Sequence, residues 1–242
     1  MKRSTKLMRL RRNTIFALAA GCLTLGMGAV YPATAIAGCS DSAAAEVDWS
    51  GCRKRNVILS GYDFTGANLE KADLIGSDMR ETNFSNANLT RATLTRANIS
   101  NSNLSGANLS KVDGGRAIFQ QVNLVNSTLE KAEMFRSDFT GSDLSGANLN
   151  KTEMGRANFT DANLENAQVT FTNLARANFA GAKLNGTDLK KSWTYLTKFN
   201  GADLSQVINL SQEQLELACG NSETKLPAGL TAPSKWPCGS DD

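Results

Sequence analysis

The sequence predicts a solenoid, in which short repeats stack into successive coils. From residue 59 to residue 204, every fifth residue is large and apolar except Gly114 and Thr194. Two residues before each of these central positions stands Ala, Ser, Thr or Val, with Tyr62 as the exception. A period of five fits neither an amphipathic helix nor an alternating strand. A fixed short period is instead typical of stacked repeats, because one repeat cannot bury its apolar side chains alone.

A second period of twenty residues indicates four repeats per coil. Phenylalanine recurs at one central position in Phe119, Phe139, Phe159, Phe179 and Phe199. Four five-residue repeats would place these rings in one column, where stacked aromatic side chains pack well. A coil of three or five repeats would scatter them.

The repeat also resembles a known family. The motif A(D/N)LXX, as in the stretch from Ser142 to Lys151, is similar to that of pentapeptide-repeat proteins, and the similarity covers residues 57–206. The resemblance implies an all-β solenoid, a right-handed quadrilateral β-helix in which each repeat forms one side. Thirty repeats would make about 7.5 coils.

Residues 1–37 are expected to be a signal peptide. Six basic residues and no acidic one accompany an apolar run over residues 15–30, and Ala35 and Ala37 fit cleavage before Gly38. The alternative, a transmembrane anchor, needs roughly 20 apolar residues, so the run is short for it. Arg11-Arg12 leaves a twin-arginine signal open, and Cys39 leaves a lipoprotein open. The expected location is the periplasm or an equivalent oxidising compartment such as a thylakoid lumen.

The mature chain carries no signal for nucleic acid. After removal of residues 1–37, 20 basic and 23 acidic residues remain. A mildly acidic chain gives no general reason to expect nucleic-acid binding. No transmembrane anchor is expected in this mature part.

Four cysteines remain in the mature chain, and an even number in an oxidising compartment predicts two disulfides. Cys39 and Cys52 would lie at one end of the stack, and Cys219 and Cys238 at the other. A bridge needs α-carbons within about 7 Å, so we expect Cys39–Cys52 and Cys219–Cys238. Lipidation of Cys39 would leave Cys52 unpaired.

Both ends are expected to be capped, since exposed strand edges invite pairing. Residues 38–56 would form an N-terminal cap with Trp49 as a plug. Residues 207–242 would form a C-terminal cap with a short helix, because Ser211 and Gln214 make a capping box. Gly220 would stop that helix, and Trp236 would pack on the same end.

Two places interrupt the repeat. At Gly114 a glycine replaces the central apolar residue, which predicts a bulge or loosened corner, with a binding notch as the alternative. At Thr194 a polar residue takes the centre between two aromatic ones. Trp193 would then either point outward as a contact site or be buried in a rearranged coil.

Nothing in the sequence predicts catalysis. The chain has no histidine, so no Ser-His-Asp or Cys-His arrangement exists. The cysteine spacings do not resemble a zinc site, and no glycine-rich phosphate loop is present. We therefore expect no enzyme, no metal and no cofactor.

Two columns of basic residues recur every twenty residues, with Asp73, Asp113, Glu133 and Glu153 between them. One interpretation is a solvated ladder of salt bridges. The other is a strip that binds an acidic partner: a protein, an anionic membrane surface or a cell-wall polymer. The candidate partner-binding residues are Lys71, Arg91, Lys111, Lys131, Lys151 and Lys191 in one column, and Arg96, Arg116, Arg136, Arg156 and Arg176 in the other.

The sequence thus favours an exported, non-enzymatic binding or scaffold protein, as a monomer or a dimer formed through a cap. A structural spacer or self-associating solenoid is the alternative. The family resemblance also permits a DNA-mimicking protector of topoisomerases, which the signal peptide and the lack of a strongly acidic face disfavour. An exported hydrolase is disfavoured because no long loop is inserted to form a cleft.

Overall fold

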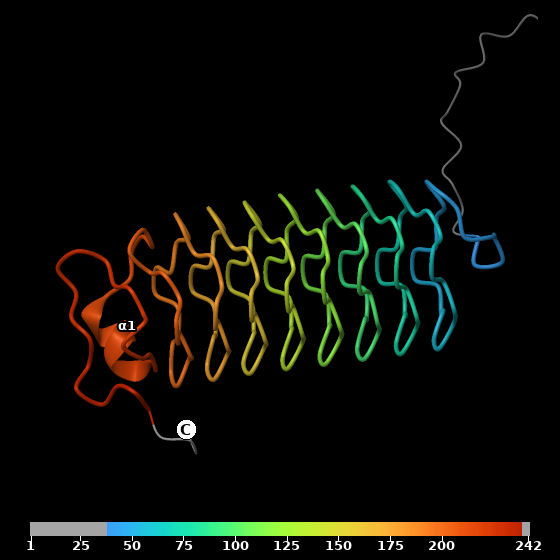
Figure 1. Cartoon of the computed structure of the whole chain (residues 1–242). Helices are drawn as coiled ribbons and strands as arrows, with labels where there is room; N and C mark the ends of the chain where they lie inside the picture. Colours follow the sequence, from blue (N-terminus) through green and yellow to red (C-terminus); the bar gives the residue numbers. More distant parts are fainter. Residues whose placement is uncertain (1–37, 239–242) are drawn as a thin grey trace, which may run out of the picture. The chain divides into compact units, whose positions relative to one another are not determined.

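The computed structural model describes residues 38–238, so the predicted signal peptide lies outside the described residues. Isolated parallel bridges join each coil to the next, from Asp48 with Asn68 to Asp188 with Ile208, always twenty residues apart. Each coil therefore has four sides of five residues, and the coils stack in chain order (Figure 1). The fold is the right-handed quadrilateral β-helix that the family resemblance implies.

The corners of the coil depend on left-handed backbone. Every fifth residue from Glu46 to Gly201 has a positive φ, between 51° and 76°. The backbone N–H of such a residue still donates to the next coil, as Lys71 does to the carbonyl of Thr90 at 2.9 Å. This conformation costs roughly 1–2 kcal/mol for a residue with a β-carbon, and glycine is the residue that adopts it readily.

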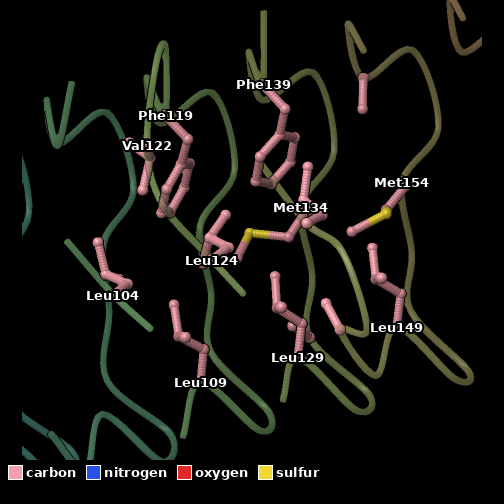
Figure 2. Close-up of a cluster of buried hydrophobic side chains, with 14 of the residues drawn as sticks. Leu104, Leu109, Phe119, Val122, Leu124, Leu129, Met134, Phe139, Leu149 and Met154 are labelled. Atoms are coloured by element: carbon pink, nitrogen blue, oxygen red, sulfur yellow. The ribbon is translucent and has the colours of Figure 1, made fainter. Parts of the chain in front are cut away.

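The central residues fill the coil. Phe119, Phe139, Phe159, Phe179 and Phe199 are buried and stack with ring centroids 4.7–5.5 Å apart. Figure 2 shows Phe119 and Phe139 across the interior from Leu109, Leu129 and Leu149 of the opposite column, with Leu104 and Leu124 of an adjacent column beside them. The small residues two positions earlier are buried as well, because the chain turns inward there.

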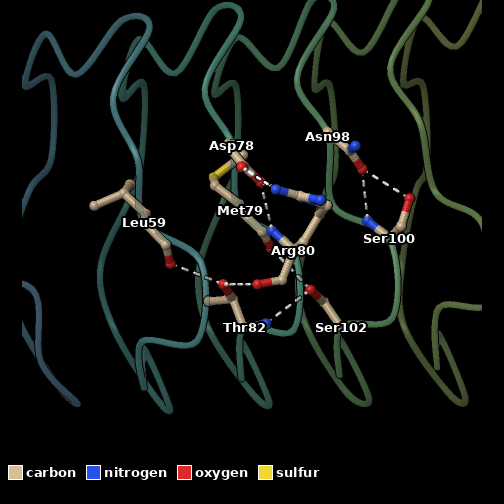
Figure 3. A network of polar contacts seen from close by, with 8 residues as sticks. All are labelled: Leu59, Asp78, Met79, Arg80, Thr82, Asn98, Ser100 and Ser102. Atoms are coloured by element: carbon tan, nitrogen blue, oxygen red, sulfur yellow. Dashed lines mark hydrogen bonds and ion pairs between the residues drawn. The ribbon is translucent and has the colours of Figure 1, made fainter.

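Small polar residues serve the same inward positions without leaving unpaired groups. The hydroxyl of Thr82 donates to the carbonyl of Leu59 at 3.0 Å, and that of Ser102 to the carbonyl of Met79 at 2.9 Å (Figure 3). Within residues 38–238, no buried side-chain nitrogen or oxygen lacks a partner. Serine and threonine thus replace alanine here at little cost, since buried polar groups are expensive only when unpaired.

The solenoid begins earlier than the sequence predicted. Asp48 already bridges to Asn68, inside the segment 38–56 that was expected to be a separate cap. Trp49 occupies a central position, and its ring meets that of Phe64 edge-on at 5.2 Å. Lys54 stands at the next central position and obscures the pattern, but its ammonium lies 3.9 Å from the centre of the Trp49 ring.

The C-terminal cap contains α1, Gln212–Leu217, the one helix of the described residues. Its capping box is the predicted one, with the hydroxyl of Ser211 accepting from the backbone of Gln214. The side chain of Gln214 donates to the carbonyls of Leu189 and Ser192, at 2.8 and 2.9 Å. These bonds fasten α1 to the exposed end of the last coils (Figure 1).

Gly220 does not stop the helix, because α1 ends at Leu217 and Ala218 is already extended. A β-carbon on Gly220 would collide with the ring of Trp236. The indole N–H of Trp236 donates to the carbonyl of Ala218 at 2.8 Å. Gly220 therefore makes room for the tryptophan that covers this end.

The disulfides pair as expected. Cys39 is joined to Cys52 and Cys219 to Cys238, with α-carbons 5.4 and 5.5 Å apart. Each bridge therefore ties a terminal segment to one end of the solenoid.

The bulge predicted at Gly114 is wrong. Asp113 bridges to Thr93 and Glu133 in regular register, and the N–H of Gly114 donates to the carbonyl of Glu133 at 2.8 Å. A β-carbon on Gly114 would collide with the sulfur of Met134. Met134 of the next coil thus fills the space of the missing side chain (Figure 2), so no notch is open there.

Candidate functional site: the cationic face

The two basic columns are two neighbouring corners of the coil. We call residues 71, 91, 111, 131, 151 and 191 the lysine corner and residues 96, 116, 136, 156 and 176 the arginine corner. All eleven side chains are exposed, and all eleven residues have left-handed backbone. The cationic face consists of these two corners and the side of each coil that lies between them. That side is residues 93–95 in one coil, 113–115 in the next, and so on to 193–195.

The backbone conformation at the corners does not require basic residues. Of the fifteen residues at the other two corners between 61 and 201, twelve are Gly or Asn, and the rest are Glu81, Gln121 and Asp161. Glycine and asparagine tolerate left-handed backbone better than Lys or Arg does. The two basic corners therefore carry side chains that are less favourable for the backbone than those the opposite corners use.

Salt bridges do not account for the basic corners either. Lys71 pairs with Glu70 at 2.8 Å and Lys131 with Glu130 at 3.3 Å, each with its own sequence neighbour. Within residues 38–238, no ion pair joins either corner to the acidic row of Asp73, Asp113, Glu133 and Glu153, because Asp73 pairs instead with Arg53 and Arg55. Exposed pairs contribute about 0–1 kcal/mol in any case.

The outward row beside the arginine corner carries mostly small residues in the middle of the cationic face. Gly115, Gly155 and Ala175 occupy the outward row beside the arginine corner, with Phe135 among them. The ring of Phe135 is 45% exposed, and a β-carbon on Gly155 would lie 3.3 Å from it. The guanidinium of Arg136 lies 5.2 Å from the ring centre. Phe135 therefore lies over Gly155 and presents apolar surface between charged corners.

Aromatic residues close the C-terminal end of this face. Trp193 and Tyr195 are 52% and 43% exposed, and their rings stack with centroids 6.2 Å apart. Phe171, which takes a place in the lysine corner, is 52% exposed with the ammonium of Lys191 5.5 Å from its ring centre.

The buried Thr194 explains why both aromatic neighbours point outward. Its hydroxyl donates to the carbonyl of Gln214 in α1 at 2.7 Å, so the polar residue keeps its central place. Side chains alternate along an extended side, which turns Trp193 and Tyr195 away from the core. The orientation of Trp193, left open by the sequence, is thus decided by the cap.

Sequence reasoning did not single out Phe135. Its sequence signal was weak: an aromatic residue next to a basic corner, with glycine twenty residues before and after it in the same row. Only the stacking of coils shows that Gly155 adjoins the ring.

Residues 38–238 contain no cluster of three metal-binding side chains and no helix long and apolar enough to cross a membrane. A depression of about 340 Å³ lies on the opposite side, lined by Lys183 and Asp203 among others. Hydrogen bonds from Ser205 and then Lys225 lower the pKa of Asp203 to about 2, so this carboxyl is ionised at neutral pH.

Comparison with known protein families agrees with the geometry. A family model described as pentapeptide repeats in eight copies matches residues 55–86 and 80–110, and one described as a pentapeptide repeat region matches residues 115–189. The chain belongs to the pentapeptide-repeat family. No curated protein matches this pentapeptide-repeat chain in sequence.

Solved structures also match this chain. HetL of the cyanobacterium Nostoc sp. strain PCC 7120, described as involved in regulation of heterocyst differentiation, is 22% identical with a TM-score of 0.44. The match covers 78% of this chain and 88% of HetL. QnrB1, a plasmid-mediated fluoroquinolone resistance protein, is 18% identical with a TM-score of 0.38, covering 74% and 86%.

A third solved structure, AT2G44920 from the thylakoid lumen of Arabidopsis thaliana, is 24% identical with a TM-score of 0.24, covering 75% and 87%. Because these identities and TM-scores are low, what those proteins do says nothing about this chain.

Proposed function

We propose that this pentapeptide-repeat protein is an exported, non-enzymatic binding module that holds an acidic partner along its cationic face. One observation carries the proposal. Eleven Lys and Arg side chains stand at left-handed corners that favour glycine, and none of them pairs with the acidic row beside it within residues 38–238. Of these eleven, only Lys71 and Lys131 form ion pairs in the described part of the chain, each with the preceding Glu, and the backbone does not favour basic residues at these corners, which supports an external anion as the partner of the face.

Export is supported by the sequence and by the cysteines. Residues 1–37 combine basic residues, an apolar run and small residues before Gly38. Both disulfides fit an oxidising compartment, since reducing compartments rarely keep such bonds. A periplasm or a thylakoid lumen would meet this requirement.

The charges of the face act together. Between residues 91 and 176, the cationic face carries nine basic and three acidic residues. Neighbouring coils are about 4.8 Å apart, whereas the screening length is about 10 Å at 0.1 M salt. The potentials of adjacent corners therefore add, which favours an extended anion over a single small one.

Chromatography on a sulfonate cation exchanger tests the proposal. The mature chain, residues 38–242, has more acidic than basic residues, so retention at pH 7.5 needs a local concentration of positive charge. We expect the protein to be retained and to elute with moderate salt. Reversal of Arg116, Arg136 and Arg156 to Glu should abolish retention.

A matched control separates the face from net charge. Lys183→Glu, Lys198→Glu and Lys235→Glu change the net charge equally but lie outside the face, so this variant should elute at a higher salt concentration than the face variant. Equal elution of the two variants, with circular dichroism showing intact folds, would refute a binding face. Proximity labelling in the native host with both variants then identifies the partner.

A further inference from the structure

We propose that the acidic partner is a polysaccharide with a carboxylate on its sugar rings, a polyuronate, lying along the cationic face. The inference rests on the proposed binding function and names the chemistry of its ligand. Three features of the face carry it: its regular spacing, the acidic row between its corners, and its exposed aromatic rings.

The face repeats once per coil, so its ligand should repeat as well. Strands of neighbouring coils are about 4.8 Å apart, and the buried rings of this chain stack at 4.7–5.5 Å. Side chains on one side of an extended peptide recur only about every 6.8 Å, so an acidic peptide loses register after a few coils. The rings of a 1,4-linked polysaccharide recur at an interval close to one coil, and in a two-fold ribbon the carboxylates on one side recur every second ring, close to two coils.

The acidic row selects against anions that carry charge alone. Asp113, Glu133 and Glu153 stand exposed or nearly so between the lysine and arginine corners. They would repel the phosphates of a membrane surface or a polyphosphate. Sugar hydroxyls instead donate to carboxylates, and hydrogen bonds to a charged acceptor are the stronger kind. A ligand with both carboxylates and hydroxyls can therefore pair with the basic corners and donate hydrogen bonds to the acidic row between them.

The two corners differ in chemistry. From residue 96 to residue 176 the arginine corner is entirely Arg, whereas the lysine corner is Lys except at Arg91 and Phe171. Guanidinium groups bind carboxylates in a planar, two-pronged manner, and ammonium groups act as point charges. We infer that the carboxylates of the chain face the arginine corner.

Aromatic rings provide contact surface for the sugars. Phe135 lies over Gly155, and the stacked pair of Trp193 and Tyr195 stands at the end of the same face. The C–H faces of sugar rings pack on flat aromatic surfaces, which an acidic peptide or a lipid headgroup does not offer in the same way. Gly155 in the next coil has no side chain, and the ring of Phe135 remains 45% exposed for such contact.

Binding of defined polymers tests the inference. The mature protein with intact disulfides is titrated with polygalacturonate, with poly-L-glutamate of equal charge, and with phosphatidylglycerol vesicles. We expect polygalacturonate to bind at least about tenfold more tightly than poly-L-glutamate, because the aromatic contacts add to the charge pairing.

Variants of the aromatic pair sharpen the test. Trp193→Ala with Tyr195→Ala should weaken polygalacturonate binding about tenfold and leave poly-L-glutamate binding unchanged. Replacement of both by Phe keeps the rings and should retain most of the affinity. Tyr62→Ala, which removes an exposed ring outside the cationic face, is the matched control and should change nothing.

The outcomes separate the two proposals. Equal affinity for both polymers, stronger binding to the vesicles, or no effect of the aromatic variant would overturn the polyuronate inference while retention on the sulfonate matrix still supports the binding face. Failure to bind any polyanion, together with no retention, would overturn both.

Discussion

Phe159 should be the most sensitive position of the phenylalanine column. Its side chain is fully buried between Phe139 and Phe179, with ring centroids at 5.0 and 4.7 Å and planes within 7° of parallel. Removal of a buried Phe side chain costs about 3–5 kcal/mol. Loss of stacking on both sides adds about 1 kcal/mol for each ring pair. We therefore expect Phe159→Ala to lower the free energy of unfolding by about 5–7 kcal/mol.

The solenoid architecture predicts how this loss appears. Each coil contacts only its neighbours, so a weakened coil in the middle divides the stack into two halves. Urea unfolding of Phe159→Ala, followed by far-UV circular dichroism, should show a lower midpoint and a broader or split transition. Phe159→Leu restores most of the volume and should cost less than about 1.5 kcal/mol.

Phe199 provides the internal comparison for this experiment. It stacks on a single ring, Phe179, at 5.5 Å and 25°. Phe199→Ala should therefore cost less than Phe159→Ala and destabilise chiefly the C-terminal coils. A loss below about 2 kcal/mol for Phe159→Ala would refute the column as the main source of packing energy.

Three further predictions concern single positions. Gly114→Leu, which restores the repeat pattern, should destabilise the protein by about 1–3 kcal/mol in urea unfolding, because the new side chain meets Met134; Met134→Ala in the same chain should recover part of the loss. Arg116→Gly should raise the free energy of unfolding by up to about 1 kcal/mol by relieving left-handed backbone while weakening retention on the sulfonate matrix; a destabilised variant would show that the fold needs this arginine. Hydrogen bonds, first of all from Ser205, lower the pKa of Asp203 to about 2, whereas the pKa of an Asp in an unfolded chain is about 3.9. The ionised carboxyl therefore stabilises the fold above pH 4, and this stabilisation is lost as the pH falls toward 2. Asp203→Asn should lower the melting temperature slightly at pH 7 and not at pH 2, a difference of less than about 1 kcal/mol at an exposed site; an equal shift at both pH values would argue against this linkage.

Local sequence was sufficient for the coil. A small residue, a polar residue and a large apolar residue every five positions define one side, because each side makes the same backbone bonds to the next coil. The twenty-residue column of Phe119 to Phe199 then defines the number of sides. The capping box of Ser211 and Gln214 was readable for the same reason, since its partners are three residues apart.

Local sequence led to wrong predictions where a residue of one coil depends on a side chain of the neighbouring coil. Lys54 hid the first coil, because nothing near it in sequence shows that it covers the Trp49 ring. Gly114 looked like a defect until Met134, twenty residues later, was seen to fill its space.

For the candidate site, too, the sequence predicted one part and the tertiary structure decided the other. The sequence by itself determined the two basic columns, since their twenty-residue period is visible without any coordinates. Only the tertiary structure decided that these residues stand at left-handed corners, that the acidic row does not neutralise them, and that Trp193 joins their face. The physical reason is that backbone conformation, ion pairing and exposure depend on neighbours one coil away, which a five-residue repeat does not encode.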